Sequence, residues 1–454
     1  MTDAPLLGGT GLDAPVAWRQ GVPISRLQFI ADAAALADRL PARGTMLNLS
    51  TDRYRFAVGL GAALLRRQSS LLPPNHLPDT IARLRLRFTD TYALIEAGAD
   101  EHALPAVGHG GAAAASSSAA VPRIAAGHVA AYVLTSGSTG EPVPHAKAWG
   151  LLTRNARAEA ARLAEMCGRA DLAGMTLVAT VPPQHMYGFE SSVLLALLGG
   201  AAFDCGRPFY PVDIAAALAR VPAPRVLVTT PFHLKALLDA NLAVAPLQLI
   251  VCATAPLSPQ LAARAEQVLA APLVEIYGCT EAGQVATRRT TAGAEWLTFD
   301  GLLLAGDGAG VSVSGGHVAE PTPLADVLEV LSPTTFRLLG RANDLVNIAG
   351  KRSSLGHLDF HLNSIDGVVD GAFWMPPDAD SNAGAGVVRL VAFVVAPELG
   401  KERIETALRS RVDAAFVPRR IVHVDALPRA TTGKLTAAAL AELAASSAVV
   451  RERR

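Results

Sequence analysis

The sequence predicts an α/β fold, with helices packed on largely parallel sheets and a smaller α+β part towards the C-terminus. Helical periodicity of apolar residues covers three segments, Gln28–Leu40, Leu151–Glu165 and Gln260–Leu269. Short apolar runs typical of buried strands lie among them, at Thr176–Val181 and Arg225–Thr230. This alternation is characteristic of α/β layers. A chain of 454 residues also exceeds the size of one compact domain.

Two further segments differ from this alternation of helices and strands. Val107–Ala126 is rich in Ala, Ser and Gly, which predicts a mobile connection between a short N-terminal lobe and the rest of the chain. Near the C-terminus, a strand expected over Arg389–Pro397 is followed by a helix expected over Ile404–Phe416. These two elements account for the predicted α+β part.

A loop rich in Gly, Ser and Thr follows the apolar run Ala130–Leu134, within the segment Tyr132–Pro142, YVLTSGSTGEP. Glycines permit backbone angles that turn successive N–H groups towards one point, and short hydroxyls add donors without bulk. A buried strand that feeds such a loop favours phosphate binding over the alternative, a flexible surface linker. The order of residues is neither that of a P-loop nor that of a Rossmann fingerprint, and it does not fit a serine hydrolase elbow.

Four more segments, all after this loop in the chain, contain residue types suited to binding or catalysis. They are Val181–Glu190 (VPPQHMYGFE), Glu275–Gly283 (EIYGCTEAG), the stretch from Asp326 to Arg352 that contains FRLLGRANDLVNIAGKR, and Leu427–Leu435 (LPRATTGKL). Taken singly, each has an ordinary structural alternative, such as a histidine that stabilises a loop, a strand followed by a capped helix, or a solvated lysine.

Together with the loop, these segments resemble the signatures of the acyl-adenylate-forming superfamily of AMP-dependent synthetases and ligases, from about Tyr132 to Lys434. The resemblance implies the adenylate-forming enzyme fold. That fold has a large N-terminal domain of layered α/β subdomains, here residues 1–340, and a small mobile α+β cap domain, here 344–454. The hinge would lie near Asn343, a residue type that tolerates unusual backbone angles.

The resemblance also implies a site for ATP and Mg²⁺. Tyr277 would stack on adenine, Thr280 would reach the α-phosphate, and Glu281 would bind the metal through hard carboxylate oxygens. Asp326 would hold the ribose hydroxyls, and Arg341 would contact ribose or phosphate. The full nucleotide set is Thr135, Ser136, Gly137, Ser138, Thr139, Gly140, Tyr277, Gly278, Thr280, Asp326 and Arg341.

Catalytic roles are implied for His185, Glu281 and Lys434. Lys434 would bridge the carboxylate and the α-phosphate during adenylation. The chain favours arginine and has only five lysines, so a lysine in a Thr-Thr-Gly loop indicates a need for a compact point charge. The acid would lie near His185, in a pocket formed by Phe189, Ala253, Thr254, Ala255 and Cys279. These side chains are small or apolar and specify no single acid.

One position departs from the family pattern. Many relatives have a lysine after Gly-x-Pro in the phosphate loop, whereas Val143 stands there in this chain. Lys147 lies four residues further on. Whether Lys147 supplies the missing charge is left open by the sequence.

The expected reaction is the activation of a small carboxylic acid, aryl or acyl, to an acyl-AMP, followed by transfer to a thiol. The segments GEPVPHAKAWG and NIAGKRSSL most resemble compact ligases that load aryl or acyl acids onto acyl carrier proteins in bacterial polyene-type lipid and pigment clusters. A carrier protein is therefore the first expected partner and free CoA the second. A nucleotide-binding homologue without catalysis is a third alternative, which the preserved Glu281 and Lys434 disfavour.

Composition argues against several other classes of protein. Forty basic and forty acidic residues give no net charge, so there is no electrostatic case for nucleic acid as a partner. The sequence has no apolar run of membrane-spanning length, and its N-terminus does not have the pattern of a signal peptide. Four scattered cysteines make neither a metal motif nor a disulfide framework. A cytoplasmic location is therefore expected.

Overall fold

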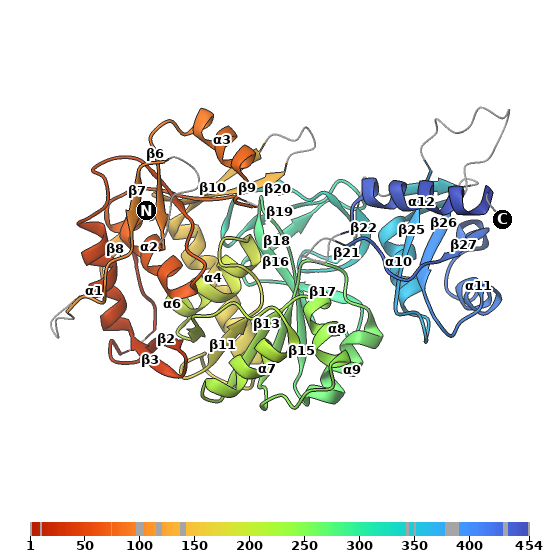
Figure 1. Cartoon of the computed structure of the whole chain (residues 1–454), viewed down its shortest axis with the longest axis horizontal. Helices are drawn as coiled ribbons and strands as arrows, with labels where there is room; N and C mark the ends of the chain where they lie inside the picture. The colour runs from red at the N-terminus through yellow and green to blue at the C-terminus, as the bar shows by residue number, and fades with distance from the viewer. Residues whose placement is uncertain are drawn as a thin grey trace.

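The computed structural model confirms the α/β class. The chain folds as a large main body, residues 2–341, and a separate C-terminal lobe, residues 345–452, which stands at one end of the molecule (Figure 1). The structure describes residues 2–9, 11–73, 75–96, 104–114, 120–136, 142–341, 345–348, 351–376, 390–429 and 435–452.

The first sheet of the main body has six strands in the order β10-β9-β5-β4-β6-β7. Their bounds are Thr45–Asn48 (β4), Ser70–Leu72 (β5), Thr91–Ile95 (β6), Ala106–Gly108 (β7), Val129–Ser136 (β9) and Pro142–Ala148 (β10). The neighbouring helices are α1 (Arg26–Ala37), α2 (Arg53–Leu65), α3 (Pro78–Arg87) and α4 (Trp149–Met166). β9 contains the apolar run before the glycine-rich loop, and β10 returns antiparallel to it at the edge of the sheet.

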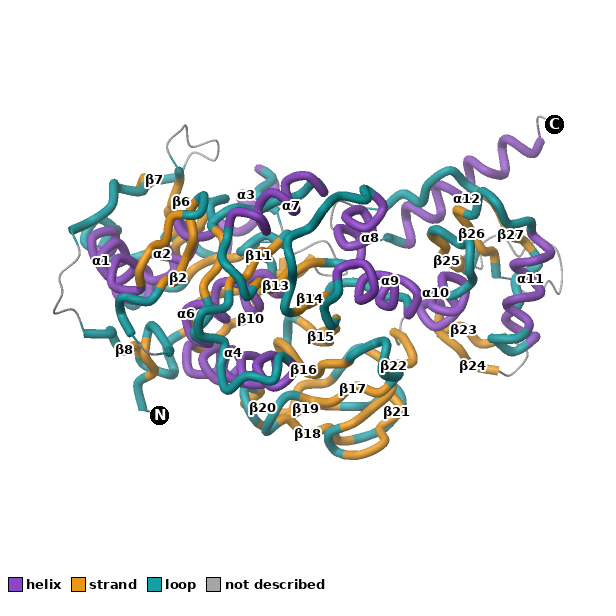
Figure 2. Tube along the Cα trace, turned by 90° about the horizontal axis from the view of Figure 1, so that it is seen from below, coloured by secondary structure: helices purple, strands orange, loops and turns teal. Residues whose placement is uncertain are grey.

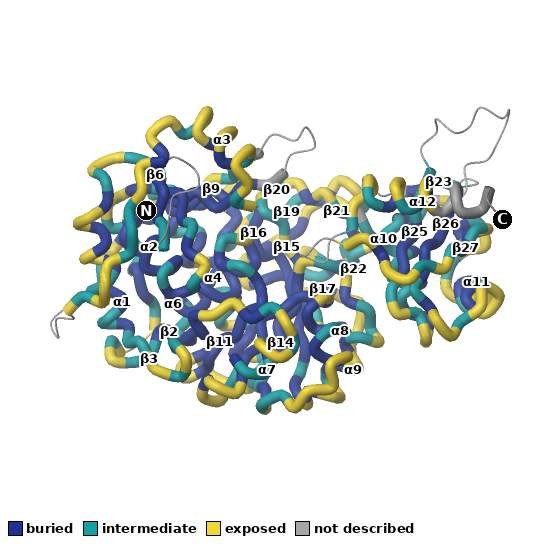
Figure 3. The backbone as a smooth tube through the Cα atoms, viewed as in Figure 1, coloured by how far each residue is buried: buried dark blue, intermediate teal, exposed yellow. Residues whose placement is uncertain are grey.

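The second sheet has eleven strands in the order β21-β22-β17-β16-β15-β14-β13-β11-β12-β2-β3. The bounds of the inner strands are Thr176–Ala179 (β11), Ala202–Asp204 (β12), Arg225–Thr229 (β13), Leu249–Cys252 (β14) and Leu273–Cys279 (β15). The outer strands are Pro15–Arg19 (β2), Val22–Ser25 (β3), Gly283–Arg288 (β16), Glu295–Thr298 (β17), Asp326–Ser332 (β21) and Thr335–Arg341 (β22). The inner strands are buried except at Arg225, Gly278 and Cys279, as their apolar runs require, and form the dark centre of Figure 3.

Helices connect the parallel strands of this sheet. They are α5 (Met186–Gly188), a π-helix (Phe189–Leu194), α6 (Leu195–Gly199), α7 (Pro211–Arg220), α8 (Pro231–Asp239) and α9 (Pro259–Leu269). A three-stranded sheet of β18 (Leu302–Ala305), β19 (Ser312–Gly315) and β20 (Val318–Pro323) adjoins it, and the short strands β1 (Ala4–Pro5) and β8 (Arg123–Ile124) pair near the N-terminus.

The C-terminal lobe has hydrophobic clusters of its own, made only of residues from Val346 onward. Its elements are β23 (Leu345–Ile348), β24 (Lys351–Ser354), α10 (Leu355–Asn363), β25 (Asp370–Trp374), β26 (Val391–Val395), α11 (Lys401–Arg409), β27 (Arg420–His423) and α12 (Ala437–Glu452). It touches the main body where α10 meets α9, and Gln260 Nε2 donates to the carbonyl of Ser364 at 2.8 Å (Figure 2).

Most predicted elements are found with shifts of a few residues at their ends. The helix expected over Ile404–Phe416 is wrong in its bounds, because α11 ends at Arg409 and Asp413 caps a separate 3₁₀ turn, Ala414–Phe416. The connection expected over Val107–Ala126 also contains strand residues at both ends, since β7 reaches Gly108 and β8 buries Ile124. Among the described residues, no helix is long and apolar enough to cross a membrane.

Candidate active site

Four parallel strands of the large sheet end at one edge, and the segments that follow them form the candidate site. β11, β13, β14 and β15 are adjacent and in register, with Ala179 opposite Val228 and Thr229 opposite Cys252. The segments that leave this edge are Thr180–His185, Thr230–His233, Ala253–Ala255 and Cys279–Glu281. Ligands of open α/β sheets bind outside the carboxyl ends of the strands, so this edge is where a substrate is expected.

The turn between β15 and β16 presents Thr280 and Glu281. A bulge between Tyr277 and Gly278 brings the backbones of the two strands so close that a Cβ at Gly278 would lie 2.4 Å from the carbonyl oxygen of Gly283. Gly283 itself has a φ of 81°, which favours glycine. The resulting tight turn leaves the side chain of Glu281 about half exposed, at 49%.

The edge strand β10 of the first sheet meets this turn. His145 and Lys147 lie on the same face of β10 as Val143, because side chains of a strand alternate between two faces. His145 Nε2 lies 3.8 Å from Glu281 Oε1, and Lys147 Nζ donates to the backbone carbonyl of Glu281 at 3.0 Å. Lys147 therefore reaches the turn from the same face of β10 as Val143, four residues further along the strand.

Lys147 is buried, and it sits beside the fully buried carboxylate of Glu190. Burial lowers the pKa of Lys147, and the negative charge of Glu190 opposes that shift. Burial likewise raises the pKa of Glu190 to about 8, while Lys147 and a hydrogen bond from Asn155 favour its ionised form. A buried charge is tolerated only when it is paired, so these groups depend on each other.

Three of the residues predicted to bind the nucleotide lie close together in the large sheet. Tyr277 donates its hydroxyl proton to Asp326 Oδ2 at 2.7 Å, and Asp326 is the cross-strand partner of Arg341 in the β21–β22 pair. The ring of Tyr277 is buried against Trp296 and Phe336, with centroid distances of 5.8 and 5.5 Å. The structure thus brings Tyr277, Asp326 and the backbone of Arg341 together.

The residues predicted to line the acid pocket fall into two groups. His185 lies directly before α5, and desolvation of its ring by the surrounding groups lowers its pKa. Phe189 is fully buried and packs edge-on against Phe56 at 6.3 Å. Tyr187 ties this segment to the sheet by donating to the carbonyl of Val251 at 2.9 Å.

The second group follows β14 and β15. Ala253 is buried, whereas Thr254 is exposed and has a φ of 84°, which is rare for a β-branched residue. Such strain tends to persist at functional sites. Burial raises the pKa of Cys279 to about 11, so its thiol stays neutral.

Several predicted residues lie outside the described part of the chain. They are Gly137, Ser138, Thr139, Gly140, Asn343 and Lys434. For Thr135, Ser136 and Arg341 the structure describes the backbone, which ends β9 and β22. The sequence reasoning missed His145, Glu190 and His233. The alternation of Val143, His145 and Lys147 along one strand could have indicated that His145 lies on the same face as Lys147.

The residues present fit a magnesium ion. Glu281 offers exposed carboxylate oxygens, which Mg²⁺ prefers, and this metal usually takes its other ligands from phosphates and water. Among the described residues, no three His, Cys, Asp or Glu side chains converge on a point that could hold a metal. A single carboxylate supplemented by substrate phosphate is consistent with both observations.

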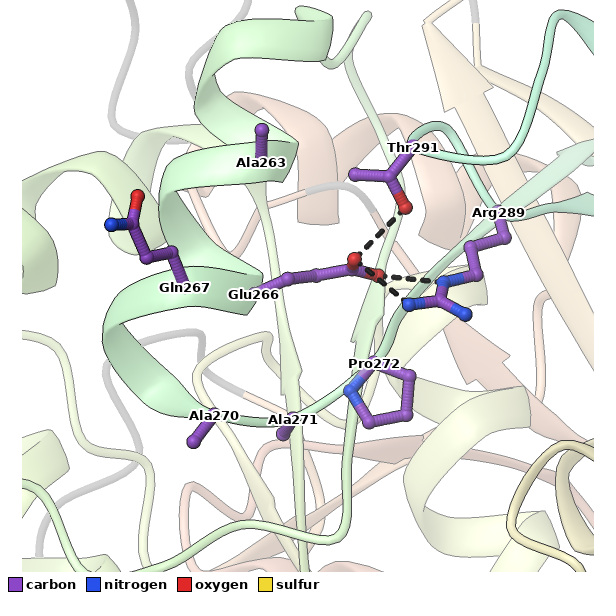
Figure 4. Close-up of a pocket in the computed structure, with 8 residues that line it drawn as sticks. All are labelled: Ala263, Glu266, Gln267, Ala270, Ala271, Pro272, Arg289 and Thr291. Atoms are coloured by element: carbon purple, nitrogen blue, oxygen red, sulfur yellow. Dashed lines mark hydrogen bonds and ion pairs between the residues drawn. The ribbon is translucent and has the colours of Figure 1, made fainter.

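A surface pocket elsewhere is not part of this site. Ala270, Ala271 and Pro272 line it just before β15 begins, so it lies at the opposite, amino edge of the sheet (Figure 4). Glu266 binds Arg289 at 2.9 and 3.0 Å and accepts from Thr291 at 2.9 Å. These paired groups hold α9 to the turn that follows β16.

Comparison with known proteins identifies the family of the chain. The family model described as AMP-binding enzyme matches residues 67–340. The 4-coumarate--CoA ligase of Rhodobacter capsulatus is 32% identical over 307 residues, 66% of this chain and 73% of its own length. The 4-coumarate--CoA ligase of Halorhodospira halophila is 30% identical over 317 residues, with the same shares of each chain.

The fold has close structural counterparts as well. The ATP-bound structure of MatB from Rhodopseudomonas palustris superposes with a TM-score of 0.78 and 17% identity, over 96% of each chain. The chain belongs to the AMP-binding enzyme family and has the adenylate-forming enzyme fold. It is an AMP-forming acid–thiol ligase that activates an acyl or aryl acid, and ATP and Mg²⁺ are its cofactors.

Proposed function

We propose that the protein joins an aryl or acyl carboxylic acid to coenzyme A. The observation that carries this proposal is the 32% identity to a 4-coumarate--CoA ligase over 73% of that protein's length. The candidate site supports it, because His185, Ala253–Ala255 and the Glu281 turn leave one edge of the sheet side by side.

The reaction has two steps. A carboxylate oxygen of the acid attacks the α-phosphorus of ATP, the bond to the bridging oxygen breaks, and pyrophosphate leaves. The thiolate of coenzyme A then attacks the carbonyl carbon of the acyl-AMP, and AMP leaves as the thioester forms. Because the acid and the triphosphate repel each other, the protein must neutralise charge and fix geometry in the first step.

The residues around the Glu281 turn are suited to that task. Glu281 would hold Mg²⁺, which when bound neutralises charge on the phosphates. Lys147 fixes the turn through its bond to the Glu281 carbonyl. Asp326 would receive the ribose hydroxyls, and it is already oriented by Tyr277. The hydroxyl and N–H groups of 135–140 and the side chain of Arg341 are proposed to contact the phosphates and ribose.

The proposal includes a movable C-terminal domain. The boundary at residues 340 and 344, with a hinge near Asn343, is supported by the separate hydrophobic clusters on its two sides. The adenylation step would use Lys434 from one face of that domain. Rotation about a hinge would then let a different face complete the thiol-transfer site.

The proposal is tested by supplying ATP, Mg²⁺ and a panel of aryl and alkyl acids to the purified protein. Pyrophosphate release in a single turnover reports adenylation, and thioester formation is then followed with free CoA and with phosphopantetheinylated carrier proteins as competing acceptors. Release of pyrophosphate followed by acyl-CoA formation is expected. No release with any acid would contradict the adenylation step.

A carrier protein is the second candidate acceptor, supported by basic residues of the C-terminal lobe. Arg403, Arg409, Arg411 and Arg419 are exposed, with Arg420 partly exposed beside them. Only Arg409 has a close acidic partner among the described residues, Glu405 at 2.7 Å. Carrier proteins are typically acidic, so this surface could serve as a docking face. The four cysteines are free thiols, which supports the proposal of a reducing, cytoplasmic location.

A further inference from the structure

His233 is a buried side chain at the candidate site that the roles assigned above do not use. It lies in the first turn of α8, immediately after β13, and only 5% of its surface is exposed. β13 lies between β11 and β14 in the sheet. His233 therefore leaves the carboxyl edge between the segment of His185 and the segment Ala253–Ala255, which are the two sides proposed for the acid.

The edge around His233 is held firmly. Thr180 and Thr229, the residues at the ends of β11 and β13, are hydrogen-bonded through their hydroxyls at 3.1 Å. The imidazole ring packs edge-to-face against Phe209 at 4.9 Å and Phe232 at 5.2 Å. These contacts restrict the orientation of the ring.

The contact between the ring and Thr230 bears on which ring nitrogen carries the proton. Thr230 Oγ1 accepts the backbone N–H of His233 at 3.4 Å and lies 2.9 Å from Nδ1. Because this oxygen already accepts one proton, its own hydroxyl is free to donate to Nδ1. Burial, with a smaller effect of Arg207, lowers the pKa of His233 to about 4, so the ring is neutral at ordinary pH. We assign the single ring proton to Nε2, with Nδ1 accepting from the hydroxyl of Thr230.

That Nε2–H group is buried and has no hydrogen-bond partner among the described residues. Buried polar groups are nearly always paired, and an unpaired donor is costly. The neighbouring phenyl rings are weak acceptors and do not replace a hydrogen bond. We therefore expect the Nε2–H group of His233 to find its acceptor on a bound ligand.

We propose that His233 is a specificity residue, which donates a hydrogen bond from Nε2 to an oxygen on the acid far from its carboxylate. The inference rests on the proposed function and deepens it. It assigns the substrate to acids whose distal end carries an acceptor, such as a phenolic hydroxyl, in preference to wholly apolar acids. A site built around a polar contact rejects an analogue that lacks it, because the buried donor is then left unpaired.

The test compares matched pairs of acids. The specificity constant kcat/KM for pyrophosphate release is measured for 4-hydroxycinnamate and for cinnamate. The same comparison is made between the acid of the panel that reacts fastest and its analogue that lacks the distal oxygen. The wild-type protein should prefer the oxygen-bearing acid by at least about tenfold. If the fastest acid has no distal acceptor, the proposal is wrong.

Variants at the residue separate this contact from general packing. His233→Phe should reduce the preference to within about threefold, mainly by losing activity on the oxygen-bearing acid. His233→Gln, whose amide can reach a similar position, should retain part of the preference. His361→Phe is the matched control, since that ring also contacts aromatic neighbours, His357 and Phe360, but lies in the C-terminal lobe.

The outcomes distinguish this inference from the proposed function. An equal preference in the wild type and in a folded His233→Phe variant, with normal pyrophosphate release, would overturn the role of His233 and leave the ligase proposal standing. A buried water on Nε2 would give that same result. No pyrophosphate release from any acid by the wild type would instead overturn the proposed function and this inference together.

Discussion

In the main body, the charged groups next to the candidate site lie beneath the surface, whereas in the C-terminal lobe they lie on it. Lys147 and Glu190 are buried together, and the Arg288–Glu275 ion pair is almost fully enclosed. In the lobe, Lys351 pairs with Asp413 and Arg409 with Glu405, all with substantial exposure. Buried pairs fix geometry and fail when one partner is lost, while exposed charges contribute little to stability and act mainly on encounter with partners.

This contrast matches the two tasks that we propose for the molecule. The main body must hold a turn and a pocket in one arrangement for adenylation. The lobe must move and meet an acceptor. The predictions below alter a charge in one region or the other, and they are ordered from the largest expected effect to the smallest.

Lys147→Met should have the largest effect. It removes the buried cation that favours the ionised form of Glu190, and it leaves the Glu281 carbonyl without its hydrogen bond, so the free energy of unfolding should fall by about 3 kcal/mol and adenylation should drop with it. Denaturant unfolding measures the first effect and pyrophosphate release the second. Lys351→Met is the matched surface control and should cost about 0–1 kcal/mol. Equal losses in both variants would remove the contrast between the two regions.

Lys434→Ala should lower acyl-AMP formation by about 10²-fold or more, because it removes one preorganised charge donor. Thiolysis of a supplied acyl-AMP should survive, since the proposed rotation moves this lysine away before that step. The two half-reactions are measured separately in rapid-quench experiments, with Lys401→Ala as a control on the same lobe. If both steps fell alike in a folded protein, the rotating-domain proposal would fail.

Glu159 provides a pH test of the buried region. This carboxyl is completely buried near Glu190, and desolvation raises its pKa to about 7 from an ordinary value near 4.5. Since the folded-state pKa is the higher one, stability should be full below about pH 4.5 and should fall as the pH rises to about 7. Glu159→Gln should flatten this dependence and stabilise the protein at pH 8 by on the order of 2 kcal/mol. Thermal melts between pH 5 and 8 give the comparison, and parallel curves for the two proteins would show that Glu159 does not titrate there.

The sequence alone predicted what depends on local order. The strand that contains Tyr132–Leu134, the helices Leu151–Glu165 and Gln260–Leu269, and the motif Glu275–Gly283 are readable because periodicity and motif spacing are local properties. The fold class and the family followed from them.

The sequence could not predict contacts between distant strands. Lys147 reaches a carbonyl 134 positions away only because β10 folds back along β9 and meets the β15–β16 turn. The orientation of His233 depends on Thr230 next to it, but its burial depends on Phe209 from a different connection. The helix expected to Phe416 ended early because Leu408 closes the last turn and Asp413 starts a new one. These outcomes are set by tertiary packing, which no local pattern contains.

Glu281→Gln should have an intermediate effect on the main body. A neutral amide is a poorer ligand than a carboxylate for a hard cation, so the Mg²⁺ concentration for half-maximal adenylation should rise by about tenfold. Stability should change little, because the side chain is half exposed. A magnesium titration of pyrophosphate release measures the shift, with Glu295→Gln as an exposed control distant from the turn. An unchanged requirement would remove Glu281 from the metal site.

The smallest effect is expected from charge reversal on the C-terminal lobe. Arg419→Glu with Arg420→Glu should slow transfer to an acidic carrier protein by a few-fold and reduce its dependence on salt, since exposed charges steer encounter and are screened by ions. Adenylation should be unaffected, because that step needs no partner, and transfer to free CoA provides the internal control. Stopped-flow transfer rates at low and high salt report the effect. Equal rates for the two proteins at low salt would exclude this face as a docking surface, and turnover with CoA but with no carrier protein would leave free CoA as the acceptor and the arginines as an ordinary solvated surface.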